Sequence, residues 1–188
     1  MIGYYTESEL AAIGFERVGR NVRISKSAAL YNCHRISIGD NIRIDNYCTL
    51  APSGNARFVI GSYVHLSAYN FMNGAADLTL EDFVTTAPYV GIFTSTDDYS
   101  GRYMTGAVVP RELIGTYSAS VLVEKHCILG VSSSVMPGVT LALGTAVGAH
   151  SFVRESSNPL DIIAGVPGKC VGKRKDDFLL LEKKISPA

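Results

Sequence analysis

Two adjacent carboxylates, Asp97 and Asp98, are the clearest candidates for chemistry in this sequence. They stand in a long segment, residues 94–119, that contains no histidine. A carboxylate can accept a proton from a reacting group when the two are within hydrogen-bond reach. The same Asp-Asp-Tyr-Ser-Gly string is also typical of a solvated turn, because Asp side chains bond to nearby backbone amides. The pair therefore indicates acid–base chemistry only where the fold brings a substrate to it.

Histidine and cysteine are scattered along the chain rather than clustered. No two of them have the spacing of metal ligands, and no CxxC pair occurs, so we expect no metal site and no disulfide framework. Widely spaced cysteines are typical of small apolar core residues in a reducing compartment. The residues in question are His34, His65, His126, His150, Cys33, Cys48, Cys127 and Cys170.

Composition and charge exclude several classes of partner. The 188 residues carry 17 Lys and Arg against 17 Asp and Glu, a balance that argues against nucleic acid or a membrane surface. No apolar stretch is long enough to span a membrane, and the first residues lack the order of a signal peptide. The length fits a single domain. We therefore expect a soluble, cytoplasmic, single-domain protein.

A period of six residues dominates the chain from Ile38 onward. The residues spaced by this period, which we call the markers, are apolar with the sole exception of Thr86, although only 47% of the chain is apolar. A small or apolar residue follows four positions later, and Gly often comes directly after the marker. Helices need a period of 3.6 and sandwich strands need strict alternation, so neither fits. The markers are Ile38, Ile44, Leu50, Ile60, Leu66, Met72, Leu80, Thr86, Ile92, Val123, Leu129, Val135, Leu141, Val147 and Val153.

This pattern predicts an all-β fold, a left-handed parallel β-helix in which three hexapeptides make one coil of a triangular prism. Stacked coils bury a common core and need caps at both ends. We expect an N-terminal cap over residues 1–35, with a short helix opened by a Thr6–Glu9 capping box and stopped at Gly14. The β-helix is expected over 36–153 with the inserted loop 94–119, and a C-terminal cap with a helix over 154–188.

Several runs carry a family resemblance. Ile128-Leu-Gly-Val-Ser-Ser-Ser-Val-Met-Pro-Gly-Val-Thr-Leu, Val147-Gly-Ala-His-Ser-Phe-Val and Ala164-Gly-Val-Pro-Gly-Lys resemble motifs of the hexapeptide-repeat acyltransferases. The resemblance covers roughly residues 36–174. The segment from Thr94 to Gly101 looks like the bacterial branch that N-acylates nucleotide-linked 4-amino-4,6-dideoxy sugars, with galactoside and xenobiotic O-acetyltransferases as relatives. It implies acetyl-CoA as cosubstrate, a nucleotide sugar as acceptor and a homotrimer with active sites between subunits.

One departure from the O-acetyltransferases bears on the acceptor. Those relatives carry a catalytic histidine in the long loop, and here Asp97 occupies that position. A hydroxyl acceptor needs a base as it attacks, whereas a neutral amine is already nucleophilic. The sequence therefore favours acylation of an amino group, and the resemblance implies a role in surface polysaccharide synthesis. An O-acetyltransferase that uses His65 as its base, and a non-catalytic β-helix scaffold, remain alternatives.

The resemblance also assigns roles to particular residues. Asp97, Asp98 and His65 are the expected catalytic group, with His65 meeting the loop of the adjacent subunit. The expected sugar contacts are Ser95, Tyr99, Tyr69 and Asn70. The backbone of Val131 and Ala149 is expected to bind the pantetheine arm of the coenzyme, and the expected phosphate contacts are Arg154, Lys169, Lys173 and Arg174.

Overall fold

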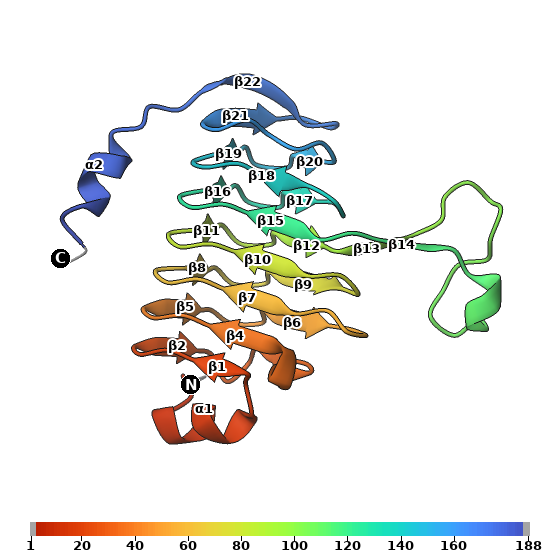
Figure 1. The fold of residues 1–188 in the computed structure, drawn as a ribbon, viewed down its shortest axis with the longest axis horizontal. Coiled ribbons are helices and arrows are strands. Elements are labelled where there is room, and N and C mark those ends of the chain that lie inside the picture. Colours follow the sequence, from red (N-terminus) through yellow and green to blue (C-terminus); the bar gives the residue numbers. More distant parts are fainter. Residues whose placement is uncertain (1–2, 186–188) are drawn as a thin grey trace.

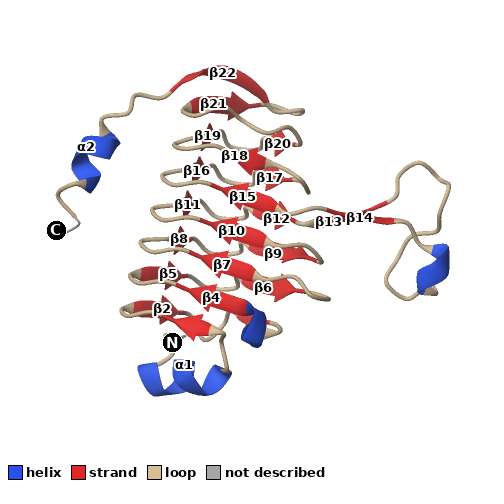
Figure 2. Cartoon of the chain, viewed as in Figure 1, coloured by secondary structure: helices blue, strands red, loops and turns tan. Residues whose placement is uncertain are grey.

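The computed structural model describes residues 3–185 and shows a stack of coils with three sheets along its length (Figures 1 and 2). Successive strands of the chain go to successive sheets, so every third strand returns to the same sheet, apart from the inserted pair β13–β14 and the last strands. The pairs between coils are parallel and in register, whereas β21 with β22 and the inserted pair β13–β14 are antiparallel. The β-helix of hexapeptide repeats expected from the sequence is confirmed.

The first sheet contains β1 (Arg17–Val18), β4 (Ile36–Ile38), β7 (Phe58–Ile60), β10 (Leu78–Leu80), β15 (Val121–Val123) and β18 (Thr140–Leu141). The second contains β2 (Val22–Ile24), β5 (Ile42–Ile44), β8 (His65–Leu66), β11 (Thr85–Thr86), β16 (Ile128–Leu129), β19 (Ala146–Val147), β21 (Asp161–Ala164) and β22 (Lys169–Lys173). The third contains β3 (Ala29–Leu30), β6 (Thr49–Pro52), β9 (Phe71–Gly74), β12 (Gly91–Phe93), β17 (Ser134–Val135) and β20 (Phe152–Val153).

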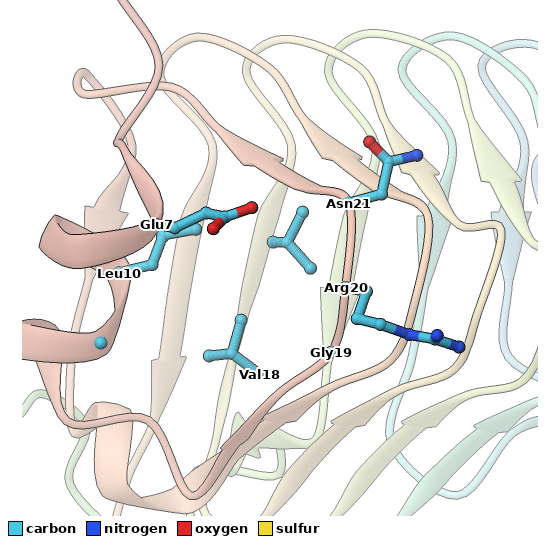
Figure 3. Close-up of a pocket in the computed structure, with 8 residues that line it drawn as sticks. Glu7, Leu10, Val18, Gly19, Arg20 and Asn21 are labelled. Carbon is cyan, nitrogen blue, oxygen red and sulfur yellow. The ribbon is translucent and has the colours of Figure 1, made fainter.

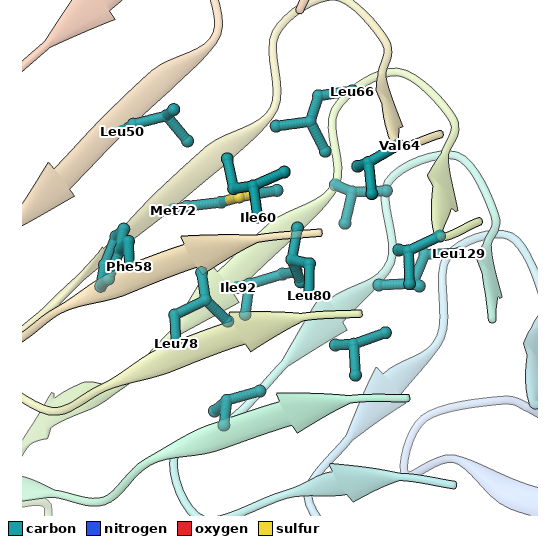
Figure 4. Packing of buried hydrophobic residues seen from close by; sticks show 14 of the residues in the cluster. Leu50, Phe58, Ile60, Val64, Leu66, Met72, Leu78, Leu80, Ile92 and Leu129 are labelled. Carbon is teal, nitrogen blue, oxygen red and sulfur yellow. The ribbon is translucent and has the colours of Figure 1, made fainter. Parts of the chain in front are cut away.

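The core is a set of columns of inward side chains (Figure 4). Every six-residue marker is buried, and even Thr86 is satisfied, because its hydroxyl donates to the carbonyl of His65. The buried positions four residues after the markers also accept small polar residues, because these residues find hydrogen-bond partners inside the prism. Ser133 and Thr145 each donate to the carbonyl three residues earlier, so burial leaves neither hydroxyl unpaired.

After some markers, glycine is required by the close approach of successive coils. A Cβ built on Gly39 would lie 2.6 Å from the backbone oxygen of Gly61, and one on Gly130 would lie 2.6 Å from the amide nitrogen of Ala149. Both neighbours are backbone atoms held in the next coil. Any larger residue there would push two coils apart.

The coils begin earlier than residue 36. Strands β1, β2 and β3 already belong to the three sheets, so the expected boundary at residue 36 lies one coil inside the stack. Helix α1 (Glu7–Ile13) covers this end, with the predicted capping box at Thr6 and Glu9 and a left-handed Gly14 after it. The short 3-10 helix η1 (Cys33–Arg35) leads into the second coil.

The other end is closed by β22 and by a segment that folds back along one edge. Arg174 donates to the carbonyls of His126 and Gly144, and its guanidinium lies over the ring of Phe178. Helix α2 (Phe178–Glu182) therefore stays beside the coils, where Glu182 pairs with His126. The expected C-terminal helix is confirmed. Within residues 3–185, no helix has the length and apolar character needed to cross a bilayer.

Candidate active site

The inserted segment forms an arm rather than an irregular loop. Strands β13 (Ser95–Asp97) and β14 (Thr116–Ser118) pair antiparallel and leave the prism between β12 and β15. The arm projects sideways from the prism and carries the 3-10 helix η2 (Arg111–Leu113) in its outer part (Figure 1). Ser95 fastens its base, because its hydroxyl contacts that of Ser118 and accepts from the amide of Ala75. The expected sugar contact at Ser95 is therefore better described as a structural link.

A hollow of about 460 Å³ in the arm brings the predicted loop residues together. Asp97, Asp98 and Tyr99 line it with Tyr103 and Tyr117. Asp98 accepts from both the amide and the hydroxyl of Ser100, and these bonds lower the pKa of its carboxyl. Asp98 thus holds the turn, as its sequence context also indicated.

The neighbouring carboxylate is placed differently. Asp97 is exposed at the end of β13, and its side chain accepts no hydrogen bond from the part of the chain that the structure describes. Tyr99 beside it is 91% exposed. A free carboxylate flanked by exposed aromatic rings can take a proton from, or orient, a bound amine. Of the two predicted acids, Asp97 has the geometry of a proton acceptor.

His65 lies on another face of the same chain, on the outer side of the second sheet. Its Nε2 is 2.9 Å from Oδ2 of Asp45, and Oδ1 of Asp45 accepts from Nε of Arg43 at 2.7 Å. These bonds hold the pKa of Asp45 below its usual range even though partial burial opposes them. The sequence did not single out Asp45 or Arg43. The length of one coil could have identified them, because outward residues about 20 positions apart meet on neighbouring strands.

Tyr69 and Asn70, two further predicted sugar contacts, differ in their exposure to solvent. Tyr69 is exposed at the corner after β8, stacked between Tyr47 and Tyr89 with ring centroids 5.0 and 4.8 Å apart. Asn70 is only 1% exposed and donates to the carbonyls of Ser67 and Ala87 inside the prism. The prediction that Asn70 contacts the sugar is wrong, because its side chain points into the core.

The predicted backbone contacts for the coenzyme lie on one corner of neighbouring coils. Val131 and Ala149 are both exposed, and the carbonyl of Val131 accepts from the amide of His150. The amides of Val131 and Ala149 themselves donate to nothing within residues 3–185. We call this corner of the two upper coils the amide edge. Two unpaired amides on one line fit the alternating polar groups of a pantetheine arm.

The four predicted phosphate contacts are not brought together. Lys169 and Arg154 lie at one end of β22 beside Glu155, whereas Lys173 pairs with Asp161 at the other end. Arg174 anchors the C-terminal segment, because its Nη1 donates to two backbone carbonyls and its guanidinium lies over Phe178. Of the four, only Arg154 and Lys169 lie together, and the phosphate contacts stay a prediction.

A second hollow lies at the N-terminal end of the prism. This hollow of about 270 Å³ between α1 and the first coil is lined by apolar side chains and by Glu7, Arg20 and Asn21 (Figure 3). It has no nucleophile and no proton acceptor other than Glu7. Over the same residues no group of three His, Cys, Asp or Glu side chains is arranged to hold a metal ion.

Comparison with known proteins identifies relatives along the whole chain. No protein-family model matches it. A dTDP-4-amino-4,6-dideoxy-D-glucose acyltransferase of Escherichia coli is 37% identical over 187 residues, which cover 100% of this chain and 97% of that protein. The solved N-acyltransferase AntD of Bacillus cereus, in complex with dTDP and 3-hydroxybutyryl-CoA, superimposes with a TM-score of 0.93 at 36% identity, covering 98% of this chain and 97% of the other.

A second solved form of AntD, a single-residue variant in complex with dTDP-4-amino-4,6-dideoxyglucose and coenzyme A, gives the same score and identity. A hexapeptide-repeat acetyltransferase of Vibrio cholerae shares the fold at 20% identity with a TM-score of 0.60, covering 91% of this chain and 82% of the other. Fold and site thus define a hexapeptide-repeat acyltransferase. The identity over the full length shows that this chain belongs to the family of acyltransferases typified by the dTDP-4-amino-4,6-dideoxy-D-glucose enzyme.

Proposed function

We propose that this enzyme transfers an acyl group from acyl-CoA to the 4-amino group of dTDP-4-amino-4,6-dideoxyglucose. The observation that carries the proposal is Asp97, an unpaired carboxylate in an arm that contains no histidine. The relatives that match the chain from end to end support the same substrates, since the curated enzyme is named for this amino sugar and a solved AntD complex contains the amino sugar with coenzyme A. Nucleotide-linked amino sugars of this kind would serve surface polysaccharide synthesis.

The reaction needs no covalent enzyme intermediate. The neutral amine attacks the thioester carbonyl carbon, a C–N bond forms, and the carbonyl oxygen becomes an oxyanion that backbone amides can stabilise. One proton passes from the nitrogen to the carboxylate of Asp97. Collapse of the intermediate breaks the C–S bond, and the departing thiolate takes up the proton held by Asp97, which returns to its carboxylate form. The products are an amide and free coenzyme A, so atoms and charge balance.

The assembly we propose is a homotrimer with active sites between subunits. In one chain, the arm and His65 lie on different faces of the prism, so Asp97 and His65 can share a site only if they come from two subunits. Large apolar side chains also stand exposed on the arm, among them Val108 at 98% and Tyr103. Exposed apolar surface of this kind is typical of an interface.

We also propose that the enzyme works in the cytoplasm. Both proposed substrates, an acyl-CoA and a nucleotide sugar, are cytoplasmic metabolites by class. The four cysteines are free thiols, two of them buried, as is usual in a reducing compartment.

The His65–Asp45 pair gives a specific reason to keep O-acylation as a second candidate, because a carboxylate that orients an imidazole makes a good base for a hydroxyl. The test compares release of free coenzyme A with dTDP-4-amino-4,6-dideoxyglucose and with its 4-hydroxyl counterpart, and mass spectrometry of the product. Turnover of the amine alone supports the proposal. Preferential turnover of the hydroxyl compound would establish the second candidate instead.

A further inference from the structure

Three basic side chains stand side by side on the outer face of the second sheet. Arg23 of β2 pairs in register with Arg43 of β5, and Arg43 pairs with His65 of β8. Neighbouring strands lie about 4.8 Å apart, so the three residues occupy adjacent rungs. Both arginines are exposed and His65 is half-buried. We call Arg23, Arg43 and His65 the basic row.

The protein neutralises this row only in part. Asp45 is the acid beside it and is shared between Arg43 and His65. Arg43 uses its Nε for that bond, and its guanidinium is otherwise exposed, with Tyr4 as its other polar neighbour. Arg23 has no acidic partner within residues 3–185, and its guanidinium lies 4.5 Å from the ring centre of Tyr4. The row therefore keeps positive charge and free donors for an anionic ligand.

Most other basic side chains in the body of the prism are already engaged. Arg20 pairs with Asp40, Arg57 with Glu16, Lys125 with Asp82 and Lys173 with Asp161. Such pairs fix side chains without leaving a binding site. Arg23 and Arg43 are the exception, because their two neighbouring guanidinium groups share at most one carboxylate. A guanidinium group is well suited to binding phosphate oxygens.

The row also has a definite position relative to the amide edge. Along the second sheet, the outward residues run from Arg23 through Arg43 and His65 to Thr85 and then Ile128. Ile128 lies three residues before Val131, where the amide edge begins. Coenzyme on the upper coils and an anion on the lower coils would therefore approach each other near His65 and Thr85.

We propose that the basic row binds the diphosphate of the nucleotide-linked sugar, with Arg43 and Arg23 contacting the phosphate oxygens. The 4-amino sugar then lies beside His65 and Thr85, below the thioester. The inference rests on the proposed function, since it assigns one end of the acceptor of that reaction. It assigns residues to the phosphates of the acceptor. The four basic residues near the C-terminus, in contrast, were predicted to contact the phosphates of the coenzyme.

Steady-state kinetics of R23Q and R43Q, with each substrate varied in turn, tests the inference. The KM for dTDP-4-amino-4,6-dideoxyglucose should rise about tenfold or more in each variant, because each loses a charge-assisted contact. The KM for acyl-CoA should stay within about twofold. The matched control is R17Q, which removes an exposed arginine of the same coil from the first sheet.

Calorimetric titration with dTDP alone separates the inference from the proposed function. Wild-type binding that weakens in R23Q and R43Q but not in R17Q supports the basic row. Equal dTDP affinity and unchanged KM in all variants would overturn the row while leaving the reaction intact. A rise in the KM for acyl-CoA instead would overturn it in favour of the coenzyme phosphates. A wild-type enzyme that neither binds dTDP nor acylates the amino sugar contradicts both proposals.

Discussion

At the scale of single residues, the candidate site depends on which polar side chains are already engaged. Asp98 is tied to Ser100, Asn70 is buried and Arg174 is committed to backbone carbonyls. Asp97 is exposed and accepts no bond within residues 3–185. A group that is to exchange protons with a ligand must keep its lone pairs free for that ligand, and this distinguishes Asp97 from its neighbour.

Replacing Asp97 by Asn should therefore reduce turnover sharply. The amide keeps the size of the carboxylate but cannot accept the proton, so kcat should fall by about 100-fold or more. The KM for acyl-CoA should change little. Steady-state kinetics on the purified variant measures both constants.

The control is E112Q, which neutralises another exposed acid of the arm outside the hollow. It should keep wild-type kcat. If D97N retains near-normal turnover, Asp97 has no part in the chemistry and the proton must leave by another route.

At the scale of elements, the coils tolerate polar residues inside but not bulk at their corners. Polar interior residues donate to nearby carbonyls, as Ser133 does with Gly130 and Thr86 does with His65. The glycines, in contrast, lie against backbone of the next coil, which cannot move alone. Stability should thus respond more to a methyl group at a corner than to a hydroxyl in the core.

The variant G39A tests this contrast. Its new methyl group would meet the backbone oxygen of Gly61 at 2.6 Å, so we expect a loss of about 1–3 kcal/mol in the free energy of unfolding. The control is G172A in β22, where the nearest atom is a flexible methyl group of Ile162 at 3.8 Å. Urea unfolding of both variants measures the difference, and equal stability of the two would contradict the steric account.

The hairpin of β21 and β22, which closes the prism, should be sensitive to acid. Asp161 is buried, and its bonds to Lys173 and the amide of Asn158 lower the pKa of its carboxyl. A lowered pKa in the folded state adds stability above the ordinary value near 3.8 and loses it as the pH falls through the lower folded value.

The thermal midpoint of the wild type should therefore drop below about pH 4. The variant D161N should be less stable than the wild type at neutral pH, and the two should converge in acid. Midpoints measured from neutral to acidic pH check this. The control D176N removes an exposed acid from the C-terminal segment. A constant gap between wild type and D161N over the whole range would contradict the assignment.

At the scale of the whole molecule, the arm connects one prism to another in the proposed assembly. Its exposed apolar side chains have no cover in the single chain. Light scattering should give a mass of about 61 kDa, three times the 20.2 kDa of one chain. A monomer at working concentrations would contradict the shared active site.

The variant V108E places a charge on the arm and should shift the assembly toward monomers, because burying an unpaired charge at an interface is costly. Far-ultraviolet circular dichroism should remain that of the wild type, since Val108 supports no coil. V171E is the control, because Val171 is 64% exposed on the capping strand β22. A variant V108E that stays trimeric and active would remove the arm from the interface.

The sequence by itself determined the prism, because the six-residue period of apolar residues indicates which side chains face inward. This period can be recognised without coordinates. The sequence also determined the capping box at Thr6 and marked Asp97 by its place in a segment without histidine. Interactions between coils were decided only by the tertiary structure. The Asp45–His65 pair, the basic row and the engagement of Arg174 join residues 20 to 48 positions apart. Their contacts depend on the register of one coil on the next, which local patterns do not encode.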